Sequence, residues 1–160
     1  MGKAITPFLW FDSQAEQAAK YYVSIFKKGS KITSVTRYGE HMPLPKGTVM
    51  TIAFKLRGND FVALNGGPVF KFSPATSFSI DCSDQKEVDH FWNKLGAGGQ
   101  HQPCGWLTDK FGVTWQVVPK QLGKLMGSKD KAKAQRVADA MMKMGKLDIA
   151  KLEAAAKAKK

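Results

Sequence analysis

The sequence repeats one arrangement of structural signals about 70 residues apart. In each copy a short apolar run is followed by a serine, and then by a helical pattern that contains two adjacent aromatic residues. A shift of about 70 residues aligns Phe8 with Phe78, Ser13 with Ser83, and Tyr21-Tyr22 with Phe91-Trp92. A fixed internal spacing of this kind is typical of a duplicated supersecondary unit. We predict two copies of a βαβββ unit, with the second copy shortened between Gly99 and Val118.

The first copy contains one helix and four strands. Ser13 and Glu16 have the spacing of a capping box, in which each side chain accepts a hydrogen bond from a backbone N–H of the first helical turn. The helix is expected to end at about Lys27, before Gly29. The residues Arg57-Gly58-Asn59-Asp60 predict a tight hairpin. The predicted strands cover residues 5–11, 31–38, 48–56 and 60–65, and the break from Gly66 to Pro74 is the predicted linker.

The second copy ends in a hairpin with two different faces. After a strand over 75–82 and a helix from Ser83 to Leu95, strands are expected over 105–108 and 113–118. Asp109 and Gly112 are the residues that favour the turn between them. Three apolar residues of the last strand alternate with two polar ones, Thr114 and Gln116. A polar face on a sheet is a candidate surface for a small molecule.

The chain becomes basic after Pro119. Residues 120–160 contain twelve Lys or Arg and four Asp or Glu, whereas the first 119 residues contain thirteen basic and nine acidic residues. Helices are predicted over 120–126, over 129–144, and from an Asp148 cap through 158, as a hairpin docked on the sheet or on a second subunit. The basic segment has no aromatic residue on which bases could stack, so a solvated helix face is favoured over nucleic-acid binding.

Cysteine and histidine usage excludes several kinds of site. Cys82 and Cys104 form no metal-binding pair and no disulfide framework, and with no apolar run of membrane-spanning length and no secretory signal they favour a reducing cytoplasm. His41, His90 and His101 fall on a loop, a helix and a strand, so the sequence does not bring them together. Without a histidine partner, Cys104 is not predicted to be a nucleophile.

Five segments together resemble the PhnB-like proteins of the glyoxalase, bleomycin-resistance and dioxygenase group, the vicinal oxygen chelate superfamily. They are ITPFLWFD, AEQAAKYYVSIFK, FVALNGGP, CGWLTDKFGVTWQVVP and AMMKMGKLDIAKLEAAAK. The resemblance implies an α+β fold in which two βαβββ modules form a curved mixed sheet around a cup, in a homodimer. We therefore predict a paired domain over 4–119, with modules over 4–67 and 75–119, followed by a helical extension over 120–160.

The resemblance also indicates where a metal would lie. Superfamily members with known chemistry hold a divalent metal through His, Glu or Gln on the first and last strands of both modules. These positions fall here on Pro7, Asn65, Ser77 and Gln116. None is an imidazole or a carboxylate, so no metal or other cofactor is predicted, and a divalent metal is the less favoured alternative.

Strand alternation extends this set to the rest of the cup. The residues that would share its face are Leu9, Phe11, Phe61, Ala63, Ser79, Asp81, Thr114 and Val118. The opposite face is uniformly apolar and is expected to lie under the helices: Phe8, Trp10, Val62, Leu64, Phe78, Ile80, Trp115 and Val117. The predicted ligand-binding residues are Phe11, Asn65, Ser77, Ser79, Thr114 and Gln116.

These residues favour a metal-free protein that binds a small organic molecule, without membrane association. Two alternatives stay open: a metal-dependent lyase, isomerase or dioxygenase, and an interaction protein that acts through the basic tail. Relatives of this type are often labelled 3-demethylubiquinone-9 3-methyltransferases, but the sequence has no glycine-rich fingerprint for a methyl-donor cofactor. The residues do not identify the ligand, decide whether a reaction is catalysed, or decide whether the modules pair within one chain or between chains.

Overall fold

The computed structural model describes residues 5–158, which divide into two compact units between Phe72 and Ser73. Each unit is described by itself. The predicted bounds at residue 4 and at residues 159–160 lie outside the described residues. None of the helices in the described chain has the length and apolarity that a membrane crossing requires.

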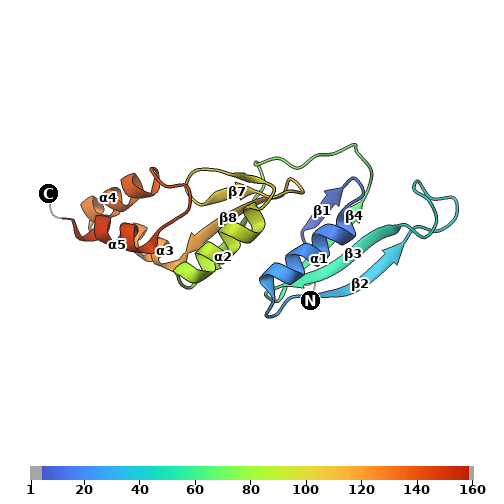
Figure 1. The fold of residues 1–160 in the computed structure, drawn as a ribbon, viewed down its shortest axis with the longest axis horizontal. Helices are drawn as coiled ribbons and strands as arrows, with labels where there is room; N and C mark the ends of the chain where they lie inside the picture. The colour runs from blue at the N-terminus through green and yellow to red at the C-terminus, as the bar shows by residue number, and fades with distance from the viewer. Residues whose placement is uncertain (1–4, 159–160) are drawn as a thin grey trace. The chain divides into compact units, whose positions relative to one another are not determined.

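Both units contain a four-stranded mixed sheet of the same topology (Figure 1). The first consists of β1 (Phe8–Phe11), α1 (Ala15–Phe26), β2 (Lys31–Arg37), β3 (Val49–Leu56) and β4 (Asn59–Asn65). The second consists of β5 (Phe78–Cys82), α2 (Gln85–Gly96), β6 (Gln100–His101), β7 (Trp106–Thr108) and β8 (Thr114–Pro119). The strand orders are β1-β4-β3-β2 and β5-β8-β7-β6, and in each sheet the first and last strands pair in parallel. The predicted duplication of a βαβββ unit and the α+β class are confirmed.

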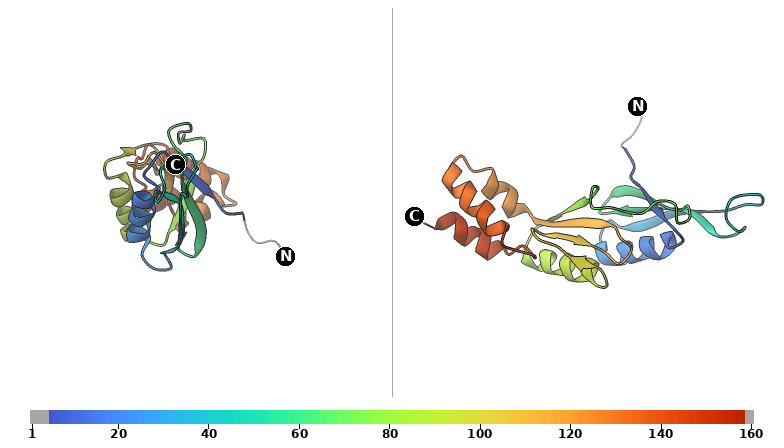
Figure 2. Two further views of the ribbon diagram at one scale, coloured as in Figure 1. Left: turned by 90° about the vertical axis from the view of Figure 1, so that its right-hand side faces the viewer. Right: turned by 90° about the horizontal axis from the view of Figure 1, so that it is seen from above.

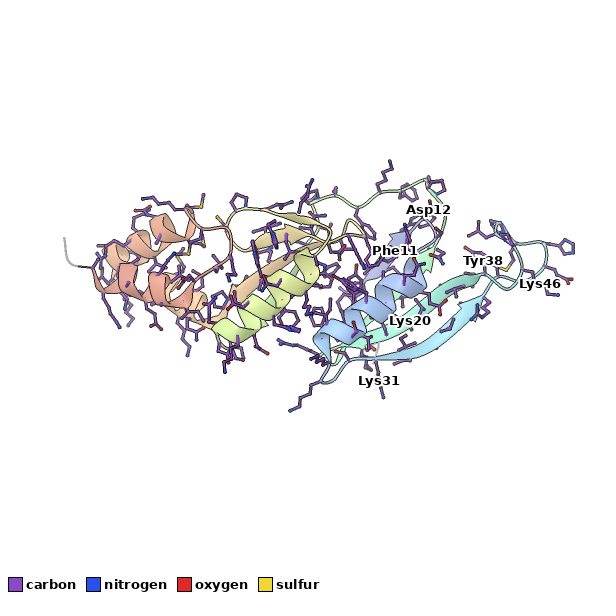
Figure 3. The ribbon with its side chains drawn as sticks, viewed as in Figure 1. Phe11, Asp12, Lys20, Lys31, Tyr38 and Lys46 are labelled. Atoms are coloured by element: carbon purple, nitrogen blue, oxygen red, sulfur yellow. The ribbon has the colours of Figure 1, made fainter. Side chains whose placement is uncertain are left out.

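The core of the first unit lies between α1 and one face of its sheet. Tyr22 of α1 and Phe54 of β3 are fully buried, and their rings stack with centroids 6.3 Å apart. Phe11 lies at the end of β1 beside this helix, and Lys20 lies on the helix itself (Figure 3). At the far end of the sheet, Arg57 and Gly58 both have positive φ and form the predicted tight hairpin between β3 and β4.

The predicted capping box at the start of α1 does not form. The N-cap residue is Gln14, which makes no side-chain capping bond. Instead the Asn65 Oδ1 accepts a hydrogen bond from the Ala15 N–H at 2.8 Å, and Glu16 pairs with Lys20. A side chain from β4 therefore satisfies the first helical turn, which local spacing alone could not predict.

The helix of the second unit carries a capping box that was not predicted, and its cap lies one residue after Ser83. The Asp84 Oδ1 accepts from the Glu87 N–H at 2.9 Å, and the Glu87 Oε2 accepts from the Ser83 N–H at 2.7 Å. Asp84, rather than Ser83, is therefore the cap, and Ser83 supplies the reciprocal donor.

The C-terminal extension comprises α3 (Lys120–Met126), α4 (Lys131–Met141) and α5 (Ile149–Lys157), which pack against one another (Figure 2). Their buried residues form one apolar cluster: Leu122, Val137, Leu147, Leu152 and Ala156. The Asp148 Oδ1 accepts from the Lys151 N–H at 3.0 Å, so the predicted cap of α5 is confirmed.

The extension is fixed to the second module by backbone hydrogen bonds. The Cys104 and Gly105 N–H groups donate to the Met144 and Gly145 carbonyls, each at 2.7 Å. On the helix side, the Gln85 amide bonds both the Leu147 carbonyl and the Ile149 N–H. The extension therefore docks on its own module, and both lie in the compact unit that begins at Ser73.

Candidate functional site

The second sheet has one apolar and one polar face. Ile80, Trp115 and Val117 are at most 4% exposed and alternate with the residues that face away from α2. On that other face Ser79 lies opposite Gln116 in the β5–β8 register, and Gln116 lies opposite Trp106 in the β7–β8 register. The alternation predicted for the β8 strand is present.

Polar side chains on this face bond one another in two groups. The Gln116 Nε2 donates to the Ser77 Oγ at 2.9 Å. Beside it, the Thr108 and Thr114 hydroxyls lie 3.3 Å apart, and the Gln102 Nε2 donates to the Thr108 Oγ1 at 3.0 Å. We call Ser77, Ser79, Gln102, Thr108, Thr114 and Gln116 the polar face. Its groups are neutral hydroxyls and amides. Ser79 is exposed and Gln116 is half-buried, so both can bond a ligand, whereas Thr114 is 1% exposed and pairs with Thr108.

Asp109 holds the turn that positions this face. Its carboxylate is 3% exposed and accepts hydrogen bonds from the Phe111 and Val113 N–H groups, at 2.8 and 3.1 Å. The second oxygen accepts from the Trp115 indole Nε1 at 2.8 Å. The turn role was predicted from the sequence. The bond to Trp115 was not, although an aspartate six residues before a buried tryptophan in a hairpin is a signal worth testing.

In the first sheet the predicted orientation of the strands is wrong. Leu9 and Phe11 are 3% and 2% exposed beneath α1, whereas Phe8 is 64% exposed on the opposite face. On β4 the buried residues are Phe61, Ala63 and Asn65. The apolar residues expected under the helix, including Phe8, therefore lie on the open face of the sheet, and the expected cup residues lie under the helix.

A difference of one residue in loop length explains the error. Three residues separate β1 from α1, whereas only Ser83 and Asp84 separate β5 from α2. The two helices are offset by 70 residues, but the buried Leu9 matches the buried Ile80, an offset of 71. A shift of one residue exchanges the two faces of a strand. The structural counterpart of the Ser79–Gln116 pair is thus the Phe8–Val62 pair.

Phe11 and Asn65 consequently contribute to the core of the first unit. The Asn65 Nδ2 donates to the Val49 carbonyl at 3.0 Å, while its Oδ1 caps α1. The Phe11 ring packs edge-on against Phe72, with centroids 5.0 Å apart. Of the six predicted ligand-binding residues, the structure places four together, namely Ser77, Ser79, Thr114 and Gln116, and places Phe11 and Asn65 elsewhere.

The available donors do not fit a metal ion. Ser77 and Gln116 are neutral and bond each other, Asn65 is engaged by the backbone, and Pro7 has no side-chain ligand. Across residues 5–158 no group of three or more His, Cys, Asp or Glu side chains is arranged to hold a metal. Divalent cations in proteins prefer carboxylate, thiolate or imidazole donors, so these neutral groups would be poor ligands for such an ion.

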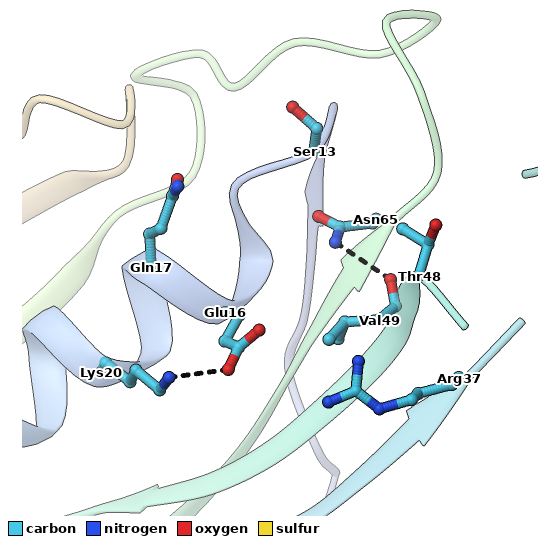
Figure 4. Close-up of a pocket in the computed structure, with 8 residues that line it drawn as sticks. All are labelled: Ser13, Glu16, Gln17, Lys20, Arg37, Thr48, Val49 and Asn65. Atoms are coloured by element: carbon cyan, nitrogen blue, oxygen red, sulfur yellow. Dashed lines mark hydrogen bonds and ion pairs between the residues drawn. The ribbon is translucent and has the colours of Figure 1, made fainter. Parts of the chain in front are cut away.

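A second polar site, which sequence reasoning missed, lies in the first unit. A cavity of about 340 Å³ opens between α1 and the β2–β3 edge of the sheet (Figure 4). Its lining residues are Ser13, Glu16, Gln17, Lys20, Arg37, Thr48, Val49 and Asn65. They come from four separate stretches of the chain, so no single motif marks them.

A protein family and several solved structures are similar to this chain. The model of the 3-demethylubiquinone-9 3-methyltransferase family matches residues 3–118, which leaves α3–α5 outside the match. A solved structure from Bacillus cereus, described as a putative 3-demethylubiquinone-9 3-methyltransferase, PhnB protein, is 35% identical with a TM-score of 0.67. The alignment covers 73% of this chain and 99% of that one. No curated protein matches the chain.

More distant structures share the fold alone. Protein PA1353 from Pseudomonas aeruginosa is 21% identical with a TM-score of 0.62, over 74% of this chain and 98% of that one. The fosfomycin resistance protein FosX from Listeria monocytogenes is 12% identical with a TM-score of 0.56, over 78% and 96%. Another structure of that FosX protein is a complex with Mn(II) and a sulfate ion. The family match and the duplicated βαβββ topology show that this chain belongs to the 3-demethylubiquinone-9 3-methyltransferase family, a PhnB-like family of the vicinal oxygen chelate superfamily.

Proposed function

We propose that this protein binds a small polar organic molecule on the polar face of its second sheet, without a metal. The observation that carries the proposal is the state of the Gln116 amide. Its Nε2 donates one hydrogen bond, to Ser77, and within residues 5–158 its Oε1 has no partner. A half-buried amide that leaves an acceptor and a donor unused is suited to a ligand that offers the complementary pair.

The neighbouring residues support a neutral ligand rather than a strongly charged one. The Ser79 hydroxyl, which is adjacent in register to Gln116, is exposed and makes no hydrogen bond within the described chain. Thr114 and Thr108 pair with each other, which keeps that part of the face rigid. A few fixed hydrogen-bonding groups beside apolar surface are the usual composition of a small-molecule site. We assign no reaction to this face: its six residues include no imidazole or carboxylate, and Asp81, the carboxylate on the same face, lies two residues beyond Ser79 on β5.

Two further properties belong to the proposal. Both cysteines are free thiols, which supports a reducing compartment such as the cytoplasm. A homodimer is expected because the PhnB-like resemblance implies one. At the two aligned positions of the second module the donors are the Ser77 hydroxyl and the Gln116 amide, which bond each other, and this neutral pair supports a metal-free protein.

The test is ligand-dependent thermal stabilisation across a panel of uncharged and polar metabolites. Saturation at about 100 times the Kd stabilises a folded protein by about 2.7 kcal/mol, which is readily detected as a rise in Tm. Gln116→Ala should abolish the rise, whereas Gln135→Ala, which changes an exposed glutamine of α4, should leave it intact. A ligand that stabilises both variants equally would place the site elsewhere.

The alternatives are tested separately. Protein purified without a metal-affinity tag should contain substoichiometric metal, and one bound divalent ion per chain would instead favour a metal-dependent enzyme. Binding to duplex DNA should be absent even at low salt, and salt-sensitive binding that is lost without residues 128–160 would favour the basic tail as the functional element.

A further inference from the structure

The cavity of the first unit is lined by more cationic than anionic side chains. It is lined by the Lys20 ammonium from α1 and the Arg37 guanidinium from β2, with Glu16 as the single acidic residue. Figure 4 shows these three charged groups converging from the helix and the strand. Two cations and one carboxylate leave a net charge of +1, which complements a monoanion.

The Arg37 guanidinium makes one hydrogen bond and has two further N–H groups that can donate. Its Nη1 donates to the Gly47 carbonyl at 2.9 Å, and this single, exposed hydrogen bond orients one edge of the guanidinium. Within residues 5–158 its Nε and Nη2 bond no other group. A guanidinium with two adjacent N–H donors matches the two oxygens of a carboxylate.

Neutral polar groups complete the lining. The side chains of Ser13, Gln17 and Thr48 make no hydrogen bond within the described chain, although all three line the cavity. Asn65, by contrast, is fully used by the Ala15 N–H and the Val49 carbonyl, so it forms a fixed wall. The open groups can bond a hydroxyl or carbonyl oxygen of the same ligand.

Glu16 tunes the charge of the cavity. Its pKa is held below the usual value, chiefly by the hydrogen bond from Lys20, then by the charge of Lys20, with a smaller contribution from the charge of Arg37. The carboxylate is therefore ionised at neutral pH, and it opposes a bound anion. Removing its charge should strengthen anion binding.

From this arrangement we propose that the cavity binds a small hydroxy- or oxo-carboxylate monoanion, with its carboxylate on Arg37 and Lys20 and its second oxygen toward Gln17, Ser13 or Thr48. A volume of about 340 Å³ lies at the lower end of the range of small-molecule sites. The site is separate from the polar face of the second unit and does not depend on it.

Calorimetric titration with lactate tests the proposal, with lactamide as the uncharged analogue. Lactate should bind, more weakly as salt is added, and lactamide should not. Arg37→Met should weaken lactate binding by about tenfold or more, since the loss of a charge-assisted hydrogen bond has an effect of that size. The matched control Lys31→Met removes an exposed cation from the same strand outside the cavity and should leave the affinity unchanged.

Glu16→Gln provides a change of opposite sign. It should tighten lactate binding severalfold, which general destabilisation of the first unit would not do, and the Tm of each variant checks folding. Lactate binding should persist in Gln116→Ala, so that failure of this site and failure of the proposed function are distinguishable. Equal binding of lactamide, unchanged affinity in Arg37→Met, or weaker binding in Glu16→Gln would each overturn the proposal.

Discussion

Replacing Asp109 by alanine removes three hydrogen bonds from the β7–β8 hairpin at once. The carboxylate accepts from the Phe111 and Val113 backbone and from the Trp115 indole. Val113 and Trp115 are each 1% exposed, so their N–H groups cannot turn to water when the acceptor is lost. Phe111 is half-buried and can bond water instead.

The expected loss follows from the two donors that stay buried. A buried donor left without a partner costs about 1–3 kcal/mol, so Asp109→Ala should destabilise the second unit by about 2–6 kcal/mol. Asp109→Asn keeps an oxygen for the backbone donors but turns an NH₂ group toward the indole, so it should cost about 1–3 kcal/mol. The control Asp60→Ala breaks only an exposed ion pair with Lys55, which contributes about 0–1 kcal/mol.

Urea unfolding measures the free energies, and hydrogen exchange assigns the loss to a unit. Peptides from residues 73–158 should exchange faster in Asp109→Ala, while those from residues 5–72 should not change. Adding Trp115→Phe should reduce the cost of Asp109→Ala, because no indole N–H is then left unpaired. If Asp109→Ala were no more destabilising than Asp60→Ala, the carboxylate would not hold the hairpin as described.

Three further predictions concern other parts of the fold. Asn65→Ala should destabilise the first unit by about 2–4 kcal/mol in urea unfolding, because a buried N–H and a buried carbonyl each lose their partner; a change below 1 kcal/mol would contradict the core role. Gly66→Ala would make a Cβ clash with the Trp10 ring, so it should lower the Tm and alter the tryptophan fluorescence, and a spectrum like that of wild type would count against the close packing. The pKa of Asp89 lies below its usual value of 3.8, chiefly because Lys146 donates a hydrogen bond to it. The pair therefore stabilises the fold above pH 4 and is lost as the pH falls below that value, so the stability difference between wild type and Lys146→Met should shrink on acidification. A stability difference between wild type and Lys146→Met that increases at low pH would contradict this prediction.

The repeated topology was predictable because each signal that carries it is local. The positive-φ turn at Arg57-Gly58, the alternation of Thr114 and Gln116 with apolar neighbours, and the Asp148 cap each depend on a few adjacent residues. The second sheet has a clear polar face, so its orientation could be inferred from the strand pattern alone.

The orientation of β1 was not predictable in the same way. Its residues are apolar on both faces, so no alternation distinguishes Leu9 from Phe8 or Trp10. The face of each β1 residue was therefore assigned from the alignment of the two copies. One extra residue before α1 shifts that alignment by one position and exchanges the two faces. Phe8 is apolar although it lies exposed on the open face, so hydrophobicity alone favoured placing it under the helix.

The capping and cavity residues of the first unit depend on tertiary contacts. Asn65 reaches the start of α1 across 50 positions of sequence, and it replaces the local cap that Ser13 was expected to provide. Arg37 and Lys20 meet at one cavity only because β2 lies beside the helix-covered edge of the sheet. Propensity and spacing carry no information about such encounters.

The contacts that attach α3–α5 to the second module determine where the chain can be truncated. The family match ends at residue 118, yet the Gly105 N–H bonds the Gly145 carbonyl, and Val118 packs against the cluster around Leu122. If the chain ended at residue 118, the N–H of the buried Gly105 would lose its hydrogen-bond acceptor. Val118, at the end of β8, would lose the apolar residues that pack against it. A chimaera that combines the second module of this protein with the first module of a shorter relative should therefore include residues 119–157 together with that second module.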